Sequence, residues 1–196
     1  MSAARPTEGD GAGAANDAAN DAASAGARVT GPHRVWRFGA DIDTDVLAPG
    51  AYMKGGLDFI APHCLESVRP EFAGKVQRGD VLAAGPNFGI GSSREQAAGV
   101  LVHLGVAAVI APSYSGLFFR NAFNLGLLLL TCPEADRLNE AEAISIDLSA
   151  PAVTTFNGKR LACAPVPGFL LDMVRAGGLL PLLRRRLAAG NPPETP

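Results

Sequence analysis

The stretch Gly85-Pro86-Asn87-Phe88-Gly89-Ile90-Gly91-Ser92-Ser93-Arg94-Glu95-Gln96 stands between two segments of different hydrophobic pattern. Residues 80–85 are a short apolar run typical of a buried strand, whereas residues 93–104 carry apolar side chains at helical spacing. Glycines let the backbone approach a ligand closely, and a helix start offers free N–H groups and a positive dipole end. The pattern therefore predicts an anion-binding turn between a strand and a helix. The turn has neither the Lys-Ser/Thr pair of a P-loop nor the spacing of a dinucleotide-binding motif, so phosphate and NAD are not its expected ligands.

The segments that follow repeat the alternation of strand and helix. Residues 106–111 and 127–130 are predicted to be buried strands, and the aromatic-rich residues 114–125 between them a helix. Strands joined by helices of this length form a parallel sheet, whose ligands gather at the carboxyl ends of the strands. We therefore expect an α/β protein with a mainly parallel central sheet.

The region upstream of this centre combines one strand with a long polar segment. Residues 34–38 alternate like a strand and lead into residues 39–56, which we expect to be a long loop. Long loops in compact domains are usually functional or disordered, so this one is a candidate functional segment. Short helical pieces are predicted after it, at 57–65 and 70–76.

The region downstream has a different pattern. Residues 144–148 and 153–156 alternate between apolar and polar side chains, and Asn157-Gly158 is a strong hairpin signal. A small antiparallel C-terminal part is therefore expected beside the parallel sheet. Helices at 169–176 and 179–188, separated by two glycines, close the predicted fold.

Length and composition are those of one folded domain. The chain has 196 residues, of which 47% are hydrophobic and 18% are charged, as in soluble α/β proteins. Residues 1–30 are mostly small or polar and cannot bury enough apolar surface to offset their ordering entropy, so they are predicted to be a disordered leader. Residues 191–196 are predicted to be a similar tail, which leaves 31–190 as the domain.

Charge and hydropathy exclude several classes of function. A net charge of -2 opposes binding to nucleic acid, and the basic run Arg184-Arg185-Arg186 fits the dipole at the end of a helix. No apolar run approaches the roughly 20 residues that a membrane-spanning helix needs. The N-terminus also lacks the features of a signal peptide. We therefore expect no membrane or nucleic-acid partner and a cytoplasmic location.

The cysteines Cys64, Cys132 and Cys163 lie far apart and form no C-x-x-C pair. This spacing predicts neither a zinc site nor a disulfide framework. A four-iron cluster normally needs several cysteine thiolates close together, so this chain alone is not expected to bind one. No residue is assigned as a metal ligand.

Ser92 and Glu95 have two interpretations. Ser-x-x-Glu before an apolar helix fits a capping box, in which the two side chains satisfy backbone donors at the helix start. The alternative is a ligand site, because two adjacent serines followed by Arg94 allow one serine to cap while the other faces a ligand beside a fixed cation.

The motif Asn87-Phe-Gly-Ile-Gly-Ser-Ser-Arg-Glu-Gln-Ala97 resembles the signature of the aconitase swivel domain, which exists separately as the 3-isopropylmalate dehydratase small subunit. Asp41-Ile-Asp-Thr-Asp45, Ala108-Val-Ile-Ala111, Gly126-Leu-Leu128 and the closing helix agree with that family in order. The resemblance covers residues 33–188. It implies a swivelling β/β/α domain of aconitase type.

The resemblance also implies roles for single residues. Ser92 would be the general base, Ser93 and Arg94 would bind substrate carboxylates, and the stretch Tyr52-Met-Lys-Gly55 would meet the variable substituent of a malate-type acid. Lys54 would favour an anionic substituent and Met53 an alkyl one, although Lys54 also fits an ordinary solvated lysine. Further residues expected in the loops or in support of the site are Asp43, Thr44, Asp45, Asn87, Gly91 and Glu95.

The implied activity is that of a small subunit that isomerises 3-isopropylmalate by dehydration and rehydration, a step of leucine biosynthesis. A large partner subunit would carry a 4Fe-4S cluster whose iron polarises the substrate hydroxyl, and this chain would bind no cofactor itself. Alternatives are a homoaconitate or methylated-malate hydro-lyase and, in another class, a non-catalytic carboxylate-binding module. The sequence departs from the family signature at Gln96, Ile90, Leu129 and Lys54, which suggests a divergent member.

Overall fold

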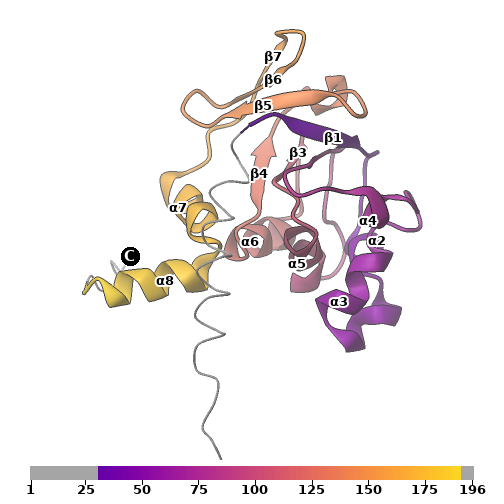
Figure 1. The fold of residues 1–196 in the computed structure, drawn as a ribbon, viewed down its shortest axis with the longest axis vertical. Helices are drawn as coiled ribbons and strands as arrows, with labels where there is room; N and C mark the ends of the chain where they lie inside the picture. The colour runs from indigo at the N-terminus through magenta and orange to yellow at the C-terminus, as the bar shows by residue number, and fades with distance from the viewer. Residues whose placement is uncertain (1–30, 191–196) are drawn as a thin grey trace, which may run out of the picture.

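Residues 31–190 are the part of the chain that this computed structural model describes, and within them seven strands form one sheet (Figure 1). The strand order is β4-β3-β2-β1-β5-β6-β7. The strands are β1 (His33–Arg37), β2 (Val81–Ala83), β3 (Ala108–Ala111), β4 (Leu128–Thr131), β5 (Ala143–Asp147), β6 (Ala152–Thr155) and β7 (Arg160–Ala162). The predicted leader and tail, 1–30 and 191–196, lie outside the described residues.

The sheet has a parallel half and an antiparallel half that meet at β1. Strands β1 to β4 pair in parallel, whereas β5 pairs with β1 antiparallel and is followed by β6 and β7 in the same sense. Every residue of β2 and β3 is buried, as expected for central parallel strands covered on both faces. The predicted α/β fold, with a mainly parallel sheet and a small antiparallel C-terminal part, is confirmed.

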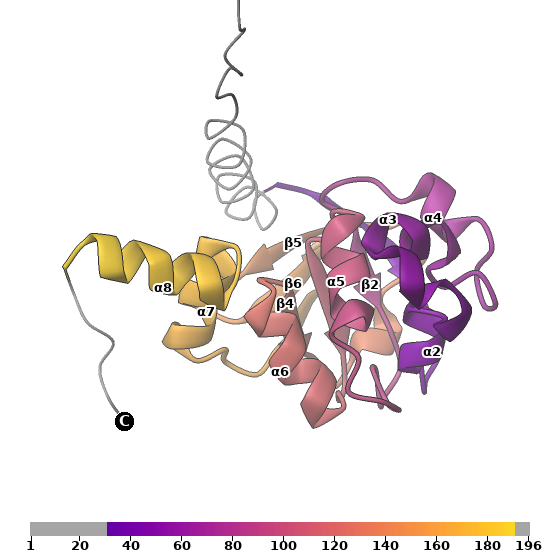
Figure 2. The same ribbon diagram turned by 90° about the horizontal axis from the view of Figure 1, so that it is seen from below.

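The helices form a row along the parallel half of the sheet (Figures 1 and 2). Helices α5 and α6 pack against each other, α2 and α3 adjoin α5, and α7 and α8 adjoin α6. The α-helices are α2 (Thr44–Leu47), α3 (Leu57–Ile60), α4 (Phe72–Lys75), α5 (Glu95–His103), α6 (Gly116–Asn124), α7 (Gly168–Ala176) and α8 (Leu179–Ala188). The 3-10 helices are η1 (Gly50–Gly55), η2 (Ala61–His63) and η3 (Ala135–Arg137).

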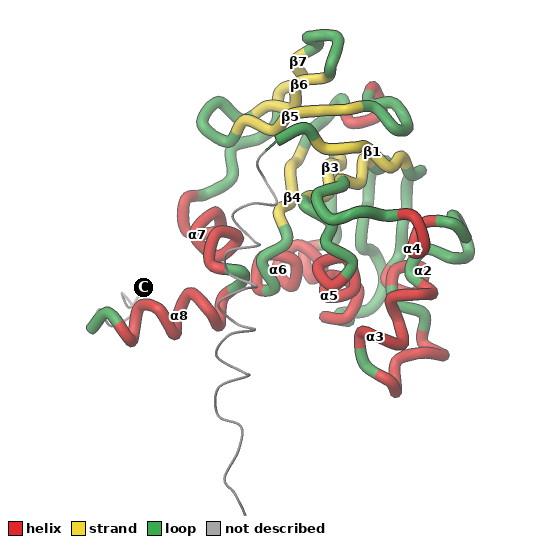
Figure 3. The backbone as a smooth tube through the Cα atoms, in the orientation of Figure 1, coloured by secondary structure: helices red, strands yellow, loops and turns green. Residues whose placement is uncertain are grey.

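The segment 39–56 was expected to be a structureless loop, and that prediction was wrong. It contains α2 and η1, which Figure 3 shows as short helical turns ahead of α3. The side chain of Asp43 caps α2 by accepting a hydrogen bond of 2.7 Å from Val46 N. Because α2 is only four residues long, a single cap and its packing decide its formation, and no periodic pattern is long enough to reveal it.

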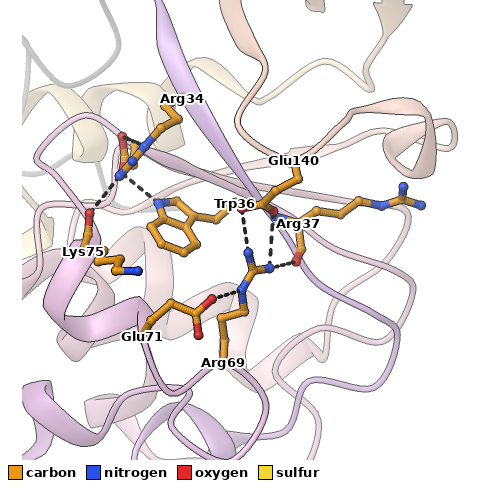
Figure 4. Close-up of polar contacts among 8 residues, drawn as sticks. Arg34, Trp36, Arg37, Arg69, Glu71, Lys75 and Glu140 are labelled. Atoms are coloured by element: carbon orange, nitrogen blue, oxygen red, sulfur yellow. Dashed lines mark hydrogen bonds and ion pairs between the residues drawn. The ribbon is translucent and has the colours of Figure 1, made fainter.

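A polar cluster around Trp36 joins the first two strands at their amino ends (Figure 4). Asp80, which directly precedes β2, is only 4% exposed and accepts hydrogen bonds from the Arg34 guanidinium, from Trp36 Nε1 at 2.8 Å and from Gln77 N at 2.9 Å. The guanidinium groups of Arg34 and Arg69 lie 4.9 and 5.3 Å from the centre of the Trp36 ring. The buried Asp80 carboxylate is therefore satisfied by donors, as buried polar groups usually are.

Candidate active site

The loops that leave β1 and β2 run side by side at the carboxyl ends of the parallel strands. Gly85 N donates to Gly39 O at 3.0 Å, and Gly89 N donates to Ile42 O at 2.7 Å. Further along, Thr44 N donates to Ile90 O at 2.8 Å. These bonds continue the parallel pairing past the strand ends, so the segment that carries Ser92 is fixed against the segment that carries Asp43 to Asp45.

Two glycines permit this close approach. Gly89 and Gly91 have φ angles of +77° and +103°, which side chains other than glycine rarely adopt. A Cβ on Gly89 would lie 2.2 Å from Phe118 Cγ, and a Cβ on Gly91 would lie 2.9 Å from Thr44 Oγ1. Glycine is therefore required at both positions by conformation and by space.

Ser92 is exposed, and its backbone is held by a buried threonine. Ser92 N donates to Thr44 Oγ1 at 3.0 Å, while the two hydroxyl oxygens lie 3.4 Å apart. Thr44 is 1% exposed and begins α2, so it is a rigid support. Ser92 is thus an exposed residue whose backbone N–H and hydroxyl both lie within hydrogen-bond distance of Thr44 Oγ1.

The capping-box alternative for Ser92 and Glu95 is wrong. Helix α5 begins at Glu95, its N-cap residue is Arg94, and no side chain caps it. The left-handed Gly91 and the bond to Thr44 place Ser92 outside the helix start, where it cannot reach the donors that a cap satisfies. The free N–H groups at the start of α5 are consequently available to a ligand.

Arg94 lies beside the serines and is oriented by the opposite loop. Its Nη1 donates to Asp45 Oδ1 and, at 3.0 Å, to Ala48 O. The Arg94 side chain is 24% exposed, so the guanidinium is partly desolvated but open to a ligand. Both bonds come from Nη1, so the three N–H donors of Nε and Nη2 remain for a ligand.

Asn121 contributes to the site and was not predicted. Its side chain, in α6, is 6% exposed and donates to Ser93 O at 3.2 Å. This bond ties the backbone of the turn to α6. The signal in the sequence was a lone amide inside the aromatic-rich helix 114–125, since a buried polar side chain needs a partner.

Asn87 and Glu95 occupy different parts of the same turn. Asn87 has a φ of +62°, its backbone N–H bonds Ser113 Oγ at 2.9 Å, and its side-chain amide bonds Asp41 Oδ1 at 2.9 Å. Asn87 therefore stabilises the conformation of the turn through these hydrogen bonds. Glu95 is exposed at the first position of α5, where a carboxylate complements the helix dipole.

The segment predicted to read the substrate lies next to Arg94. A Cβ on Gly50, the first residue of η1, would lie 4.0 Å from Arg94 Nη2 and 3.9 Å from Asp45 Oδ1. Lys54 follows on the same 3-10 helix and is exposed, and its side chain makes no hydrogen bond or ion pair with any other described residue. The structure thus places η1 beside the arginine and gives Lys54 no structural partner within residues 31–190.

The turn rests on an aromatic layer. Phe88 is fully buried and packs edge-on against Tyr114 and Phe118, with ring centroids 6.4 and 5.3 Å apart. The Tyr114 hydroxyl lies 2.8 Å from both Val109 O and Leu130 O, and burial raises the pKa of Tyr114 well above its usual value. The tyrosine therefore stays protonated and serves as a support beneath the loop.

Within residues 31–190, no group of three or more His, Cys, Asp or Glu side chains is placed to hold a metal ion. Cys64, Cys132 and Cys163 are free thiols, and burial raises the pKa of the Cys64 thiol. These residues therefore do not fit as ligands of an iron-sulfur cluster. None of the described helices is long and apolar enough to cross a membrane.

Comparison with known proteins identifies the class of this domain. Residues 69–135, which include the serine turn, match the model of the aconitase C-terminal domain. A 3-isopropylmalate dehydratase small subunit of Thermotoga maritima is 40% identical over 155 residues, which are 78% of this chain and 93% of that protein. A crystal structure of 3-isopropylmalate dehydratase from Methanocaldococcus jannaschii superposes with a TM-score of 0.76 at 36% identity, covering 81% of this chain and 96% of that one.

The fold and the turn are therefore those of an aconitase-type swivel domain. More narrowly, the chain belongs to the family of 3-isopropylmalate dehydratase small subunits. A methanogen homoaconitase small subunit of Methanothermobacter thermautotrophicus is also 43% identical over 150 residues, which are 75% of this chain and 86% of that protein. The family thus includes relatives named for more than one substrate.

Proposed function

We propose that this chain is the small subunit of a hydro-lyase that isomerises 3-isopropylmalate and 2-isopropylmalate by dehydration and rehydration. One observation carries the proposal: Ser92 is an exposed residue next to Arg94 and the uncapped start of α5, and its side chain does not cap that helix. The family membership supplies the reaction class.

In this proposal Ser92 takes the proton from the carbon next to a substrate carboxylate. A serine hydroxyl is scarcely ionised at neutral pH, so the site must stabilise negative charge on oxygen. A helix start contributes about 0.3 to 2 kcal/mol, and one oriented oxyanion donor about 2.7 to 4 kcal/mol. The N–H groups that begin α5 and the Arg94 guanidinium must therefore act together on Ser92 Oγ.

Arg94 and Ser93 bind the carboxylates of the acid. A planar guanidinium pairs with a carboxylate through two parallel bonds, which fixes both position and orientation. Asp45 and Ala48 O hold Nη1, so the remaining N–H groups point in a fixed direction before the substrate arrives. This preorganisation lowers the entropic cost of placing the carbon-bound proton next to Ser92.

The active enzyme, in this proposal, also needs a large partner subunit. The cysteines of this chain do not form a cluster site, so the 4Fe-4S cluster is assigned to that partner. When bound there, the cluster supplies a Lewis acid for the substrate hydroxyl. The isolated chain is therefore expected to be inactive, and the location of the complex is expected to be the cytoplasm.

The test is reconstitution. This chain is mixed anaerobically with candidate large subunits, and formation of the unsaturated acid is followed by its ultraviolet absorbance. Ser92→Ala is expected to lower kcat by about 10²- to 10⁴-fold without weakening the complex, the usual contribution of a general base. Ser67→Ala is the matched control, since Ser67 is exposed and far from the turn in sequence. If the Ser92→Ala variant keeps a kcat close to that of the wild type, Ser92 is not the general base.

A second candidate substrate is homoaconitate, favoured by the exposed cation of Lys54 on η1 and by the methanogen relative. Lys54→Met replaces an ammonium by an apolar chain of similar length. If Lys54 reads an anionic substituent, the variant loses activity with the carboxylate-bearing acid and keeps it with 3-isopropylmalate. An unchanged preference would leave Lys54 as a solvated lysine.

A non-catalytic carboxylate-binding module is the remaining alternative. Calorimetry of the isolated chain with malate-type acids separates it from the hydro-lyase, because a module binds tightly without a partner. If no large subunit gives an active complex and the isolated chain shows saturable binding of a malate-type acid, the carboxylate-binding module replaces the hydro-lyase as the proposed function.

A further inference from the structure

We infer that His63 is a positioning residue that holds the substrate-reading turn η1 in place through a ring stack with Tyr52. The inference rests on the proposed function, because it assigns to η1 the contact with the variable part of the acid. The two rings are parallel to within 2°, and their centroids lie 3.5 Å apart. Tyr52 lies in η1 and His63 ends η2, so the stack joins two separate turns.

The turn η1 is anchored only by side chains that are partly buried. None of its residues is buried, and it is followed by Gly56 in the left-handed region at a φ of +78°. Its backbone bond is local, from Tyr52 N to Pro49 O at 3.0 Å. A six-residue 3-10 turn without buried side chains has low intrinsic stability, so it depends on the Tyr52 ring, on Met53, which packs against the core, and on Gly55, which lies against the Phe59 ring.

His63, by contrast, is mounted on a rigid base. The next two residues, Cys64 and Leu65, are fully buried, and Leu65 N donates to Val46 O at 2.9 Å. This bond ties the segment to the end of α2, next to the loop that supports Ser92. The His63 backbone therefore moves with the active-site frame.

The imidazole ring is also fixed in rotation. His63 Nδ1 lies 2.6 Å from Glu66 Oε2, and because a carboxylate only accepts hydrogen bonds, Nδ1 carries the proton. The side chains of His63 and Glu66 are 32% and 40% exposed, so neither is needed to fill the core. A surface histidine held by a carboxylate and laid flat on a tyrosine has the geometry of a support for that tyrosine.

The position of the stack gives it a consequence for substrate choice. The start of η1 lies beside Arg94 and Asp45, and Met53 and Lys54 directly follow Tyr52. When Tyr52 is held, these two side chains keep one position relative to the guanidinium that binds the carboxylate. When Tyr52 is not held, Ser92 can still act on the substrate, but the variable substituent of the acid is bound more weakly.

The experiment compares His63→Ala, His63→Phe and the matched control His103→Ala. His103 is an exposed histidine that also lies near a carboxylate, 3.4 Å from Asp58, but it has no ring contact with η1. Hydrogen exchange on the full-length chain reports the anchoring of residues 50–55, and kinetics of the reconstituted pair report KM and kcat for 3-isopropylmalate and homoaconitate.

For His63→Ala we expect faster exchange across 50–55 and a KM higher by about threefold to tenfold, the effect of losing one ring pair, with kcat unchanged. His63→Phe keeps a flat ring over Tyr52 and is expected to restore most of the protection. His103→Ala is expected to change neither quantity.

Unchanged exchange in His63→Ala, or no rescue by His63→Phe, would overturn the positioning role. A parallel fall of kcat for both acids would also contradict it, because that result means damage to the Ser92 frame. If the wild-type pair is inactive with both acids, the proposed function fails, while the exchange data still decide whether His63 anchors η1.

Discussion

The two ends of the same parallel strands have opposite character. At the amino ends of β1 and β2, the buried Asp80 carboxylate accepts hydrogen bonds from Arg34, Trp36 and Gln77. At the carboxyl ends, Ser92 and Ser93 are exposed, and Arg94 is only partly paired. The same strands therefore end in a saturated cluster on one side and in unsatisfied donors on the other.

This difference separates stability from chemistry. A buried polar group without its partner costs free energy, so a saturated cluster stabilises the fold and has nothing left to bind. Exposed donors on a fixed backbone add little to stability, but they are available to a ligand. Substitutions at the amino ends should therefore change the free energy of unfolding, and substitutions at the carboxyl ends should change activity.

The largest expected effect on stability is that of Asp80→Ala. It leaves Trp36 Nε1 and Gln77 N without an acceptor and removes the partner of Arg34. We expect a loss of about 3 kcal/mol in the free energy of unfolding, at the lower end for a broken buried pair because Arg34 stays 38% exposed and regains water. Urea unfolding measures the loss, and kcat per folded molecule should not change.

Asp58→Ala is the control, since the Asp58 side chain is 87% exposed. It should shift the free energy of unfolding by less than about 0.5 kcal/mol. Equal losses for both variants would mean that the Asp80 cluster is not a special source of stability.

Arg94→Lys tests the opposite end of the strands. Lysine keeps the charge but cannot pair with a carboxylate through two parallel bonds. We expect kcat/KM of the reconstituted enzyme to fall by an amount that corresponds to about 1.5 to 3 kcal/mol of lost transition-state stabilisation, the range for a hydrogen bond to a charged group. The free energy of unfolding should change little. If the unfolding midpoint falls together with the activity, Arg94 stabilises the fold through its bond to Asp45 and does not bind the substrate.

Gly91→Ala should affect both properties, because Gly91 joins them. Alanine is strained at a φ of +103°, and its Cβ would lie 2.9 Å from Thr44 Oγ1. We expect a loss of about 1 to 2 kcal/mol in the free energy of unfolding from the backbone conformation, together with lower kcat from displacement of Ser92. Gly74→Ala is the matched control, since a Cβ there meets no atom within 4 Å. A Gly91→Ala variant with wild-type kcat would show that the position of Ser92 does not depend on this turn.

The regular elements could be predicted from the sequence because their patterns are local. Apolar runs and helical spacing placed β2, β3, β4, α5 and α6 within a few residues of their observed bounds. Strand β7 is three residues long and had no prediction of its own, because its formation depends on pairing with β6 across the turn at Gly158. Helix α2 could not be predicted because its four residues are too few to show a helical pattern.

The residues of the candidate site could be singled out from the sequence, but their contacts could not. The serine turn and the loop with Thr44 and Asp45 were both singled out, yet 48 residues separate Thr44 from Ser92. No local pattern encodes a bond over that distance, so the choice between a cap and a ligand site stayed open. In the structure, the left-handed Gly91 and the bond to the buried Thr44 hydroxyl exclude the cap, and the ligand site stays a prediction.

Thr44→Val is the smallest and most specific change to this arrangement. Valine keeps the shape of threonine and its β-branch but removes the hydroxyl that accepts from Ser92 N. We expect a loss of about 0.5 to 1.5 kcal/mol in the free energy of unfolding, the net value of one hydrogen bond. Because this bond fixes the backbone of Ser92, we expect the main effect on kcat. The fold decrease in kcat should be several times larger than the fold increase in KM. Thr44→Ser, which keeps the hydroxyl and loses only the methyl group, should restore kcat. A Thr44→Val enzyme with unaltered kcat would mean that Gly91 and Asn121 alone hold the serine turn.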